Sequence, residues 1–550
     1  MTKPKPSSAF ALSRRSLFQL GIVGGALAAA PLAAQSAKGF THGVASGEPG
    51  PSGALLWTRY VGGQEIDLQW EVARDDGFGQ VVASGTVAAS PDRDWCAKAA
   101  VTGLEPDSWY YYRFIAPDGA MSCTGSTRTL PVGRVETFRM AVVGCSNKAF
   151  GWFNAYAHIA EQGDFDVVLH TGDYFYEYPI GTYPSPEQAL AGRAIAPDHE
   201  TIALADYRER FASYRSDPDL QRLHQLYPMI HVSDDHETAN DSYALGAENH
   251  DPATEGSWDV RKRAAQQARS EWLPVSDEPW AAYEIGDLAT LFRLETRLTA
   301  RTKPFDLGDI AKRGGGDPAK TLAALEAFRD GEWRDPSRTL MGEVQEGWLA
   351  DGLKTSRRSG KTWQVLLQQV IMASLRSSPG LAEGMTDAVP DYLRKRITAG
   401  ALNGKVGLPF NMDAWDGYPA ARERLLRSAQ EADANLVVLA GDSHNAWASE
   451  LDNAGAGAGI EFAGHSVCSP GFEGYLSWVP PESLARQSVE TNPQLKWAET
   501  AHRGYMAVEL TPARATSEYR FLETIRSRTT RLASAKRISS AAGSQKLDIG

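Results

Sequence analysis

Five short apolar runs in the second part of the chain constrain its fold more than any other feature of the sequence. They cover residues 140–143, 166–170, 229–232, 362–367 and 436–440. Short, continuous apolar runs are typical of strands that are buried on both faces of a sheet. Longer stretches with helical periodicity separate them, and one example is residues 419–432, which begin with a proline. The alternation predicts an α/β fold built around a buried sheet.

Four of these runs end in a cluster of polar side chains. The clusters contain Cys145 and Asn147, then Asp173 and Tyr176, then Asp234, Asp235 and His236, and finally Asp442 and His444. In open α/β sheets, ligands bind beyond the carboxyl ends of the strands, so we expect these side chains to meet at one edge. Any one cluster alone is typical of a capped turn or a solvated loop. Four in this order are better explained by a shared function.

The residue types in these clusters are those of a metal centre. Carboxylates suit hard cations, whereas imidazole, thiolate and phenolate suit transition metals. Four aspartates that converge without cations would repel one another and raise their own pKa values, and bound cations remove that cost. The sequence therefore predicts a metal site.

Residues 38–134 have a different pattern, in which short strands with aromatic and β-branched residues are separated by Gly, Pro and Asp. This pattern predicts a β-sandwich of about seven strands. We expect the α/β unit to occupy residues 135–533, with a surface excursion over 301–336, and residues 534–550 to form a flexible tail because they are small and polar.

The amino-terminal residues 1–37 have the pattern of a signal peptide. Arg14 and Arg15 precede an apolar stretch over residues 20–34. Paired arginines before such a stretch resemble a twin-arginine signal, which predicts recognition by the twin-arginine export machinery, a periplasmic or secreted protein, and no transmembrane anchor after cleavage. An ordinary secretory signal or a buried helix are the alternatives. Because export permits disulfides, Cys96 and Cys123 are a candidate pair.

The charge balance excludes one class of function. The chain has 550 residues, with 56 Lys and Arg against 68 Asp and Glu. An acidic protein without a basic excess has no counterions to release from a polyanion, so we expect no nucleic-acid binding surface and no binding to anionic lipid.

With its motifs in view, the chain resembles the metallophosphoesterase superfamily, and within it the alkaline phosphatase D (PhoD-like) branch. The resemblance rests on Phe40–Pro49 with Leu56–Arg59, on Gly172-Asp173-x-x-Tyr176, on Asp235-His236-Glu237, on Asp442-Ser443-His444 and on Asp413–Pro419. It implies an αββα sandwich, of the α/β (α+β layered) class, preceded by a small all-β domain of immunoglobulin or fibronectin type.

The resemblance also implies a set of ligands. Fe(III) would be held by Cys145, Asp173, Tyr176 and His444, and Asp173 would bridge to Ca²⁺ held by Asp235 and Asp442. Oxygen-only ligands at that second position fit Ca²⁺ better than Zn²⁺. Asn147 is a candidate further calcium ligand. Asp234 is a candidate ligand for a second Ca²⁺ or an orienting residue.

The reaction expected from these ligands is hydrolysis of a phosphoester, a monoester or a diester, by in-line attack of a metal-bound hydroxide on phosphorus. His236 matches the superfamily histidine that contacts phosphate or the leaving group, and its alternative role is to orient a ligand. Arg297 follows a strand and is expected in a surface ion pair, with a phosphate contact as the alternative. A phospholipase or phosphotriesterase on the same scaffold, and a non-catalytic binding protein, are the other functions considered.

Overall fold

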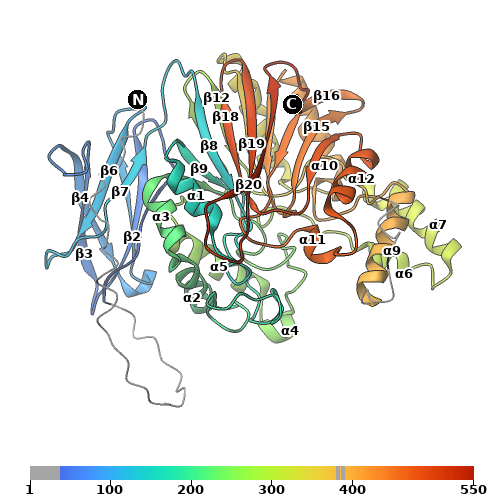
Figure 1. Ribbon diagram of the computed structural model, residues 1–550, viewed down its shortest axis with the longest axis horizontal. Coiled ribbons are helices and arrows are strands. Elements are labelled where there is room, and N and C mark those ends of the chain that lie inside the picture. Colours follow the sequence, from blue (N-terminus) through green and yellow to red (C-terminus); the bar gives the residue numbers. More distant parts are fainter. Residues whose placement is uncertain (1–37, 379–384, 386–390) are drawn as a thin grey trace.

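A computed structural model describes residues 38–378, 385 and 391–550, so the predicted signal peptide lies outside the described residues. None of the described helices has the length and apolar character needed to cross a membrane. Two large sheets form the centre of the molecule (Figure 1), a sandwich of strands adjoins one end of it, and a helical arm projects from the other end.

The first seven strands make the sandwich predicted for the amino-terminal part. They are β1 (Gly39–Gly47), β2 (Gly53–Val61), β3 (Ile66–Ala73), β4 (Val81–Ala89), β5 (Cys96–Thr102), β6 (Trp109–Ile115) and β7 (Gly125–Arg128). Side chains of β6 alternate between buried and half-buried, with Tyr110, Tyr112 and Phe114 facing inward, as the period of two requires. These three rings pack against Val44 of β1 and Leu56 of β2 in a shared core.

The sandwich is joined to the main body through one of its sheets. β3, β4, β6 and β7 form a separate four-stranded sheet, whereas β1, β2 and β5 extend a sheet of nine strands. The joint is a short parallel pairing in which Ser46 of β1 lies opposite Pro228 of the body. Trp57 of β2 also donates a hydrogen bond to the carbonyl of Glu271, at 2.7 Å.

The nine-stranded sheet has the order β20-β19-β18-β8-β9-β10-β1-β2-β5. Its other members are β8 (Phe138–Val143), β9 (Val167–His170), β10 (Pro228–His231), β18 (Gly504–Leu510), β19 (Arg514–Leu522) and β20 (Leu532–Ala541). The strands β8, β9 and β10 are parallel neighbours, so their carboxyl ends lie at one edge.

A second sheet of seven strands has the order β11-β12-β13-β14-β16-β15-β17. Its strands are β11 (Ala281–Ile285), β12 (Ala289–Arg293), β13 (Trp363–Leu367), β14 (Leu436–Ala440), β15 (Ala446–Asn453), β16 (Ala456–Ala463) and β17 (Leu495–Glu499). Leu169 and Ile230 of the first sheet share a core with Leu291, Val365 and Val437 of the second. The two sheets therefore pack face to face.

Helices cover the outer faces of both sheets. The nine-stranded sheet packs against α1 (Asn154–Gln162), α2 (Leu204–Arg215), α3 (Pro218–Leu226) and α5 (Trp258–Trp272). The seven-stranded sheet packs against α8 (Gly342–Arg358) and α10 (Pro419–Glu431). The helix expected over residues 419–432 is confirmed, with Leu425, Leu426 and Ala429 buried. The layered αββα fold preceded by an all-β part is also confirmed.

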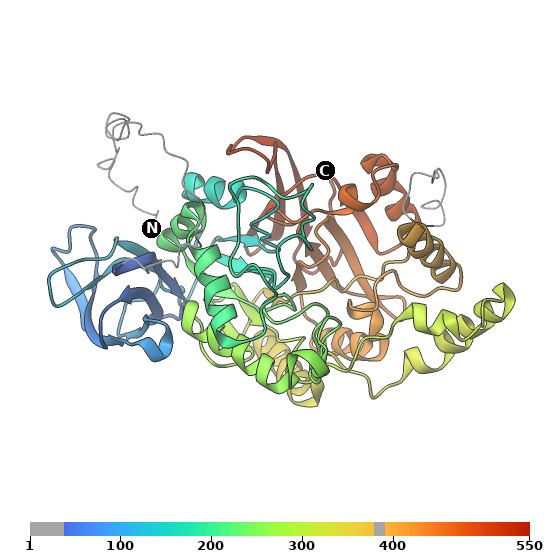
Figure 2. The ribbon, with the colours of Figure 1, turned by 90° about the horizontal axis from the view of Figure 1, so that it is seen from below.

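The remaining helices are short or peripheral. The arm consists of α6 (Leu307–Lys312), α7 (Pro318–Asp330) and α9 (Asp391–Lys405), and Figure 2 shows it opposite the blue strands of the sandwich. Ile310, Leu325 and Phe328 give it a small core of its own. The others are α4 (Pro252–Glu255), α11 (Phe472–Tyr475) and α12 (Pro481–Thr491).

Two expectations are corrected by the structure. The carboxyl-terminal segment is not a flexible tail from residue 534, because β20 pairs with β19 along its length and buries Ile538. Cys96 and Cys123 are both free thiols. Cys96 lies on β5 of the nine-stranded sheet, whereas Cys123 follows β6 of the four-stranded sheet, so the two belong to different layers.

Candidate metal centre

The four polar clusters that follow the apolar strands meet at the carboxyl ends of those strands. Ligand atoms of three overlapping groups lie within 4.8 Å of one another: Cys145 with Asp173 and His444, Asp173 with Asp235 and His236, and Asp234 with Asp235 and Asp442. The first sheet supplies these residues from the ends of β8, β9 and β10, and the second sheet supplies Asp442 and His444 from the end of β14. Asp173 belongs to two groups, so it stands between them.

Glycines allow the loops to approach this closely. A side chain on Gly172 would place its Cβ 2.3 Å from Cβ of Asp234, and the backbone there has φ of +108°. A Cβ on Gly144 would lie 2.3 Å from Oγ1 of Thr171. Glycine is required at both positions because real Cβ atoms do not approach other atoms so closely.

The candidate ligands themselves have an uncommon backbone conformation. Cys145, Asp173, Asp442 and His444 have φ of 56°, 53°, 61° and 60°, which is the left-handed region. Such conformations cost free energy and persist only where the surrounding structure enforces them, and they are concentrated at functional sites. The coincidence of four in one cluster is independent support for a site here.

Tyr176 connects the first group by hydrogen bonds. Its hydroxyl lies 3.0 Å from Oδ2 of Asp173 and 2.9 Å from Nε2 of His444, and it accepts a hydrogen bond from Oγ of Ser469 at 2.7 Å. The other ring nitrogen of His444 lies 2.8 Å from the carbonyl of Pro470. His444 therefore carries its proton on Nδ1 and presents Nε2 to the cluster.

Two buried glutamates hold the loops that carry the candidate ligands. The carboxylate of Glu237 accepts hydrogen bonds from the backbone N–H groups of Asp173, Tyr174 and Asp234, at 3.2, 2.7 and 2.9 Å. Glu177 lies 2.7 Å from Nδ1 of His236. Glu237 thus holds the chain under two clusters, and Glu177 sets the orientation of the imidazole.

Arg297 occupies a position that the sequence did not indicate. It is fully buried, and its guanidinium lies 2.6 Å from Asp234 and 3.4 Å from Asp442, with Asp413 also in contact. The expectation of a surface ion pair is wrong. The segment after β12 turns into the interface between the two sheets, where it meets acidic side chains from both.

Burial dominates the ionisation of these groups. It raises the pKa values of Asp173 and Asp234 well above the ordinary range and that of Asp442 to about 7, with the neighbouring carboxylates adding to the effect. Burial also raises the pKa of the Cys145 thiol. The pKa of Asp235 is lowered despite burial, because Arg297 and His236 lie beside it. A cluster with this much unneutralised acidity favours positive ions.

The acidic groups also have unused ligand atoms. Oδ1 of Asp173, Oδ2 of Asp234 and Oδ1 of Asp235 are buried and lack hydrogen-bond partners. Buried carboxylate oxygens are rarely left unpaired, and a cation supplies the missing partner. The donor set of carboxylates, imidazole, thiol and phenol fits metal ions. Asn147 is less available, because its amide already bonds the carbonyl of Tyr183 and the N–H of Ala149.

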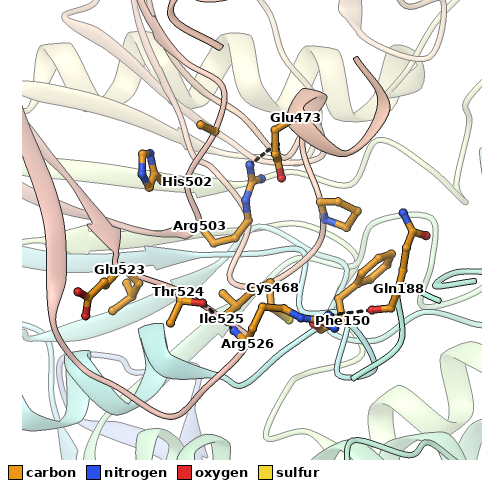
Figure 3. A pocket seen from close by; sticks show the side chains of 13 residues that line it. Phe150, Gln188, Cys468, Glu473, His502, Arg503, Glu523, Thr524, Ile525 and Arg526 are labelled. Carbon is orange, nitrogen blue, oxygen red and sulfur yellow. Dashed lines mark hydrogen bonds and ion pairs between the residues drawn. The ribbon is translucent and has the colours of Figure 1, made fainter. Parts of the chain in front are cut away.

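Several residues outside the predicted set of ligands hold the loops around the candidate centre. Arg503 donates hydrogen bonds to the carbonyls of His444 and Ser469 and forms an ion pair with Glu473 at 2.7 Å (Figure 3). It lines a cavity of about 400 Å³ beside Cys468. Trp447 donates to Ser443 at 2.8 Å. His170 is buried in the core, and so are Tyr174, Trp415 and Tyr418.

Comparison with known proteins identifies the class to which this fold belongs. A family model described as "PhoD-like phosphatase" matches residues 140–519, and a model of its amino-terminal domain matches residues 26–131. The chain is 32% identical over 509 residues to alkaline phosphatase D of Bacillus subtilis strain 168, covering 88% of this chain and 77% of that protein. A solved structure entitled "Structure of PhoD" superimposes with a TM-score of 0.74 at 29% identity, covering 93% and 92% of the two chains.

The fold and these matches define a phosphoric ester hydrolase. Within this class, the chain belongs to the PhoD-like phosphatase family.

Proposed function

We propose that this protein is an exported, metal-dependent hydrolase of phosphomonoesters or phosphodiesters, and that its active centre is the edge where the four clusters meet. The observation that carries the proposal is the overlap of three ligand groups through Asp173 and Asp235, together with three buried carboxylate oxygens that lack partners. Overlapping groups are the arrangement that a pair of neighbouring cations requires.

The donor atoms at the two ends of the proposed centre suit different ions. Cys145, Asp173, Tyr176 and His444 combine thiolate, carboxylate, phenolate and imidazole, which suit iron(III). Asp235 and Asp442 offer oxygen alone, which suits Ca²⁺, and Asn147 is a candidate to complete that site. Because Arg297 already bonds one oxygen of Asp234, an orienting role for this aspartate is favoured over ligation of a second Ca²⁺.

When bound, the ions supply a water of lowered pKa and positive charge against the phosphoryl oxygens. The side chains of the protein position the phosphoester and the ions. His236 is buried, and Asp235 and Glu177 raise its pKa well above 6.5 despite burial. Because Nδ1 is engaged by Glu177, Nε2 is left to donate a hydrogen bond to a phosphoryl oxygen or to the leaving oxygen. Asp173 holds the two ends of the centre together.

Hydrolysis of p-nitrophenyl phosphate and of bis-p-nitrophenyl phosphate tests the function and separates a monoesterase from a diesterase. Asp173→Ala should abolish turnover of both, whereas the matched change Asp198→Ala, at a side chain that is 87% exposed, should leave it unchanged. Turnover by Asp173→Ala near that of the wild type would remove the proposed centre. Failure of the wild type to hydrolyse either ester would remove the function.

Export rests on Arg14 and Arg15 before the apolar stretch of residues 20–34. Replacement of both arginines by lysine should leave the uncleaved precursor in the cytoplasm, detected by fractionation and immunoblotting. Normal export of this double variant would point to another route.

A further inference from the structure

A cavity of about 630 Å³ lies apart from the candidate metal centre, and we name it the arginine cavity. Its walls come from α5, from the segments that follow β10 and β12, from residues 276–279, and from the 3-10 helix Pro91–Arg93 of the sandwich. None of the residues in the three candidate ligand groups lines it. Glu237 lines the cavity and lies between it and the loops of Asp173 and Asp234, whose backbone N–H groups it binds.

Four arginines line the cavity: Arg93, Arg263, Arg269 and Arg293. Arg293 is 1% exposed, and it forms an ion pair with Glu48 and donates to the carbonyl of Glu278, while its Nε lacks a partner. Arg269 donates to the carbonyl of His231 at 3.2 Å, and its Nε is also buried without an acceptor. In the part of the chain that the structure describes, neither Arg263 nor Arg269 has a carboxylate within 4.0 Å.

A buried histidine adds a second unpartnered group. His231 is 1% exposed, and neither of its ring nitrogens makes a hydrogen bond. Its Nε2 lies 3.4 Å from Oε1 of Glu237 without hydrogen-bonding geometry. Buried polar atoms without partners are rare in folded proteins, and several in one cavity indicate a missing ligand.

Glu48 pairs with Arg293, but the buried and half-buried carboxylates that line the cavity are engaged by other groups. Glu271 is engaged by Arg208 through both oxygens, at 2.7 Å each. Glu295 accepts the N–H groups of Arg297, Leu298 and Thr299. Glu237 accepts three N–H groups, as described above. The other acidic side chains, Asp92, Asp277 and Glu278, are exposed to solvent at the rim, where water screens their charge.

Burial and the neighbouring charge of Arg293 lower the pKa of Arg269 to about 10, which is the expected sign for a cation with too little counter-charge. The guanidinium has a planar set of donors that matches the oxygens of phosphate and of carboxylate. A cavity of about 630 Å³ also exceeds the space that a bare oxyanion needs, so the anion can carry an organic group.

We propose that the arginine cavity binds a small molecule with an oxyanion group, a phosphate or a carboxylate, through Arg269 and Arg293, with Arg263 at the rim. The ligand binds independently of the proposed hydrolysis, because it uses none of the residues assigned to the metal centre. The bound ligand would lie beside His231 and Glu237, and Glu237 also accepts the backbone N–H groups of Asp173 and Asp234.

The site is tested by diffraction and by calorimetry on the full chain as purified. Crystals soaked in selenate should show anomalous selenium density beside Arg269. Titration with inorganic phosphate and, separately, with succinate distinguishes the two oxyanion classes. For whichever probe binds, Arg269→Gln should weaken the affinity at the cavity by about tenfold or more, since charge-assisted hydrogen bonds are lost.

Controls separate a lost site from a damaged protein. Arg269→Lys keeps the charge and should retain part of the affinity, and Arg134→Gln, at a side chain that is 82% exposed, should bind as the wild type does. Hydrolysis of p-nitrophenyl phosphate by Arg269→Gln without added anion should equal that of the wild type, so a failure of the cavity and a failure of the proposed function give different results. If Arg269→Gln does not fold, Arg263→Gln at the rim takes its place.

Absence of selenium density from the cavity of the wild type would overturn the proposal. Equal affinities of the wild type and of Arg269→Gln for the probe that binds would overturn it as well.

Discussion

Replacement of Arg297 by methionine tests the electrostatic account of the proposed metal centre. The guanidinium is fully buried and lies within 4.0 Å of four carboxylates, at 2.6 Å from Asp234, 2.5 Å from Asp413, 3.4 Å from Asp442 and 3.6 Å from Asp235. Methionine fills much of the same volume but leaves this acidic cluster with less positive charge. Removal of one partner from a buried ion pair costs about 3–5 kcal/mol. We expect Arg297→Met to lower the free energy of unfolding by this amount in chelated protein.

The measurement is urea unfolding followed by near-ultraviolet circular dichroism, with and without added Ca²⁺. The cation should restore part of the loss, because it neutralises the same carboxylates. The matched control is Arg313→Met, since Arg313 makes an exposed ion pair with Glu332 in the arm, and its midpoint should equal that of the wild type. A change of less than about 1 kcal/mol for Arg297→Met, which is the range of surface ion pairs, would refute the reasoning.

Three further predictions concern other parts of the molecule. Burial raises the pKa of Glu461 to about 7, although this carboxylate accepts the N–H groups of Met372 and Ala373. The folded state therefore binds the Glu461 proton more tightly than the unfolded state, and the free energy of unfolding should fall as the pH rises from about 4.5 to about 7, by up to about 1.4 kcal/mol per pH unit. Glu461→Gln should show a smaller slope. Gly172→Ala should destabilise the protein by well over 1 kcal/mol in thermal unfolding, because the added Cβ would lie 2.3 Å from Cβ of Asp234. Gly133→Ala should cost less, because Gly133 also has a positive φ but its added Cβ would have no atom within 4 Å. Equal losses would contradict the steric argument. If Tyr176 donates a phenolate to iron, the purified protein should be coloured and Tyr176→Phe should lose the visible band; an unchanged band would exclude this tyrosine as the chromophore.

The strands and the edge were predictable because they depend on local pattern. The apolar runs that became β8, β9, β10, β13 and β14 are buried on both faces, so each reads as a continuous apolar segment, and the polar residues follow at once. Parallel order within the first sheet then brings the carboxyl ends of β8, β9 and β10 together. The proximity of Asp173 and Asp235 follows from these two facts, whereas Asp442 reaches them only because the second sheet packs face to face against the first, which local pattern does not specify.

Arg297 was not predictable in the same way. Its partners Asp234 and Asp413 are 63 and 116 residues away in the chain, and the local sequence Leu294-Glu295-Thr296-Arg297 carries no sign of which carboxylates will approach it. The strand β20 was missed for a related reason. Its residues are mostly small or charged and lack alternation, and its order comes from backbone pairing with β19, a tertiary contact that composition does not record.

The most direct test of the proposed centre is elemental analysis of the protein purified after native export. The account predicts iron and calcium in whole-number ratios to protein, with loss of activity on chelation of Ca²⁺ and recovery when it is added back. Purified, active enzyme with neither metal, or with full activity after exhaustive chelation, would contradict the account.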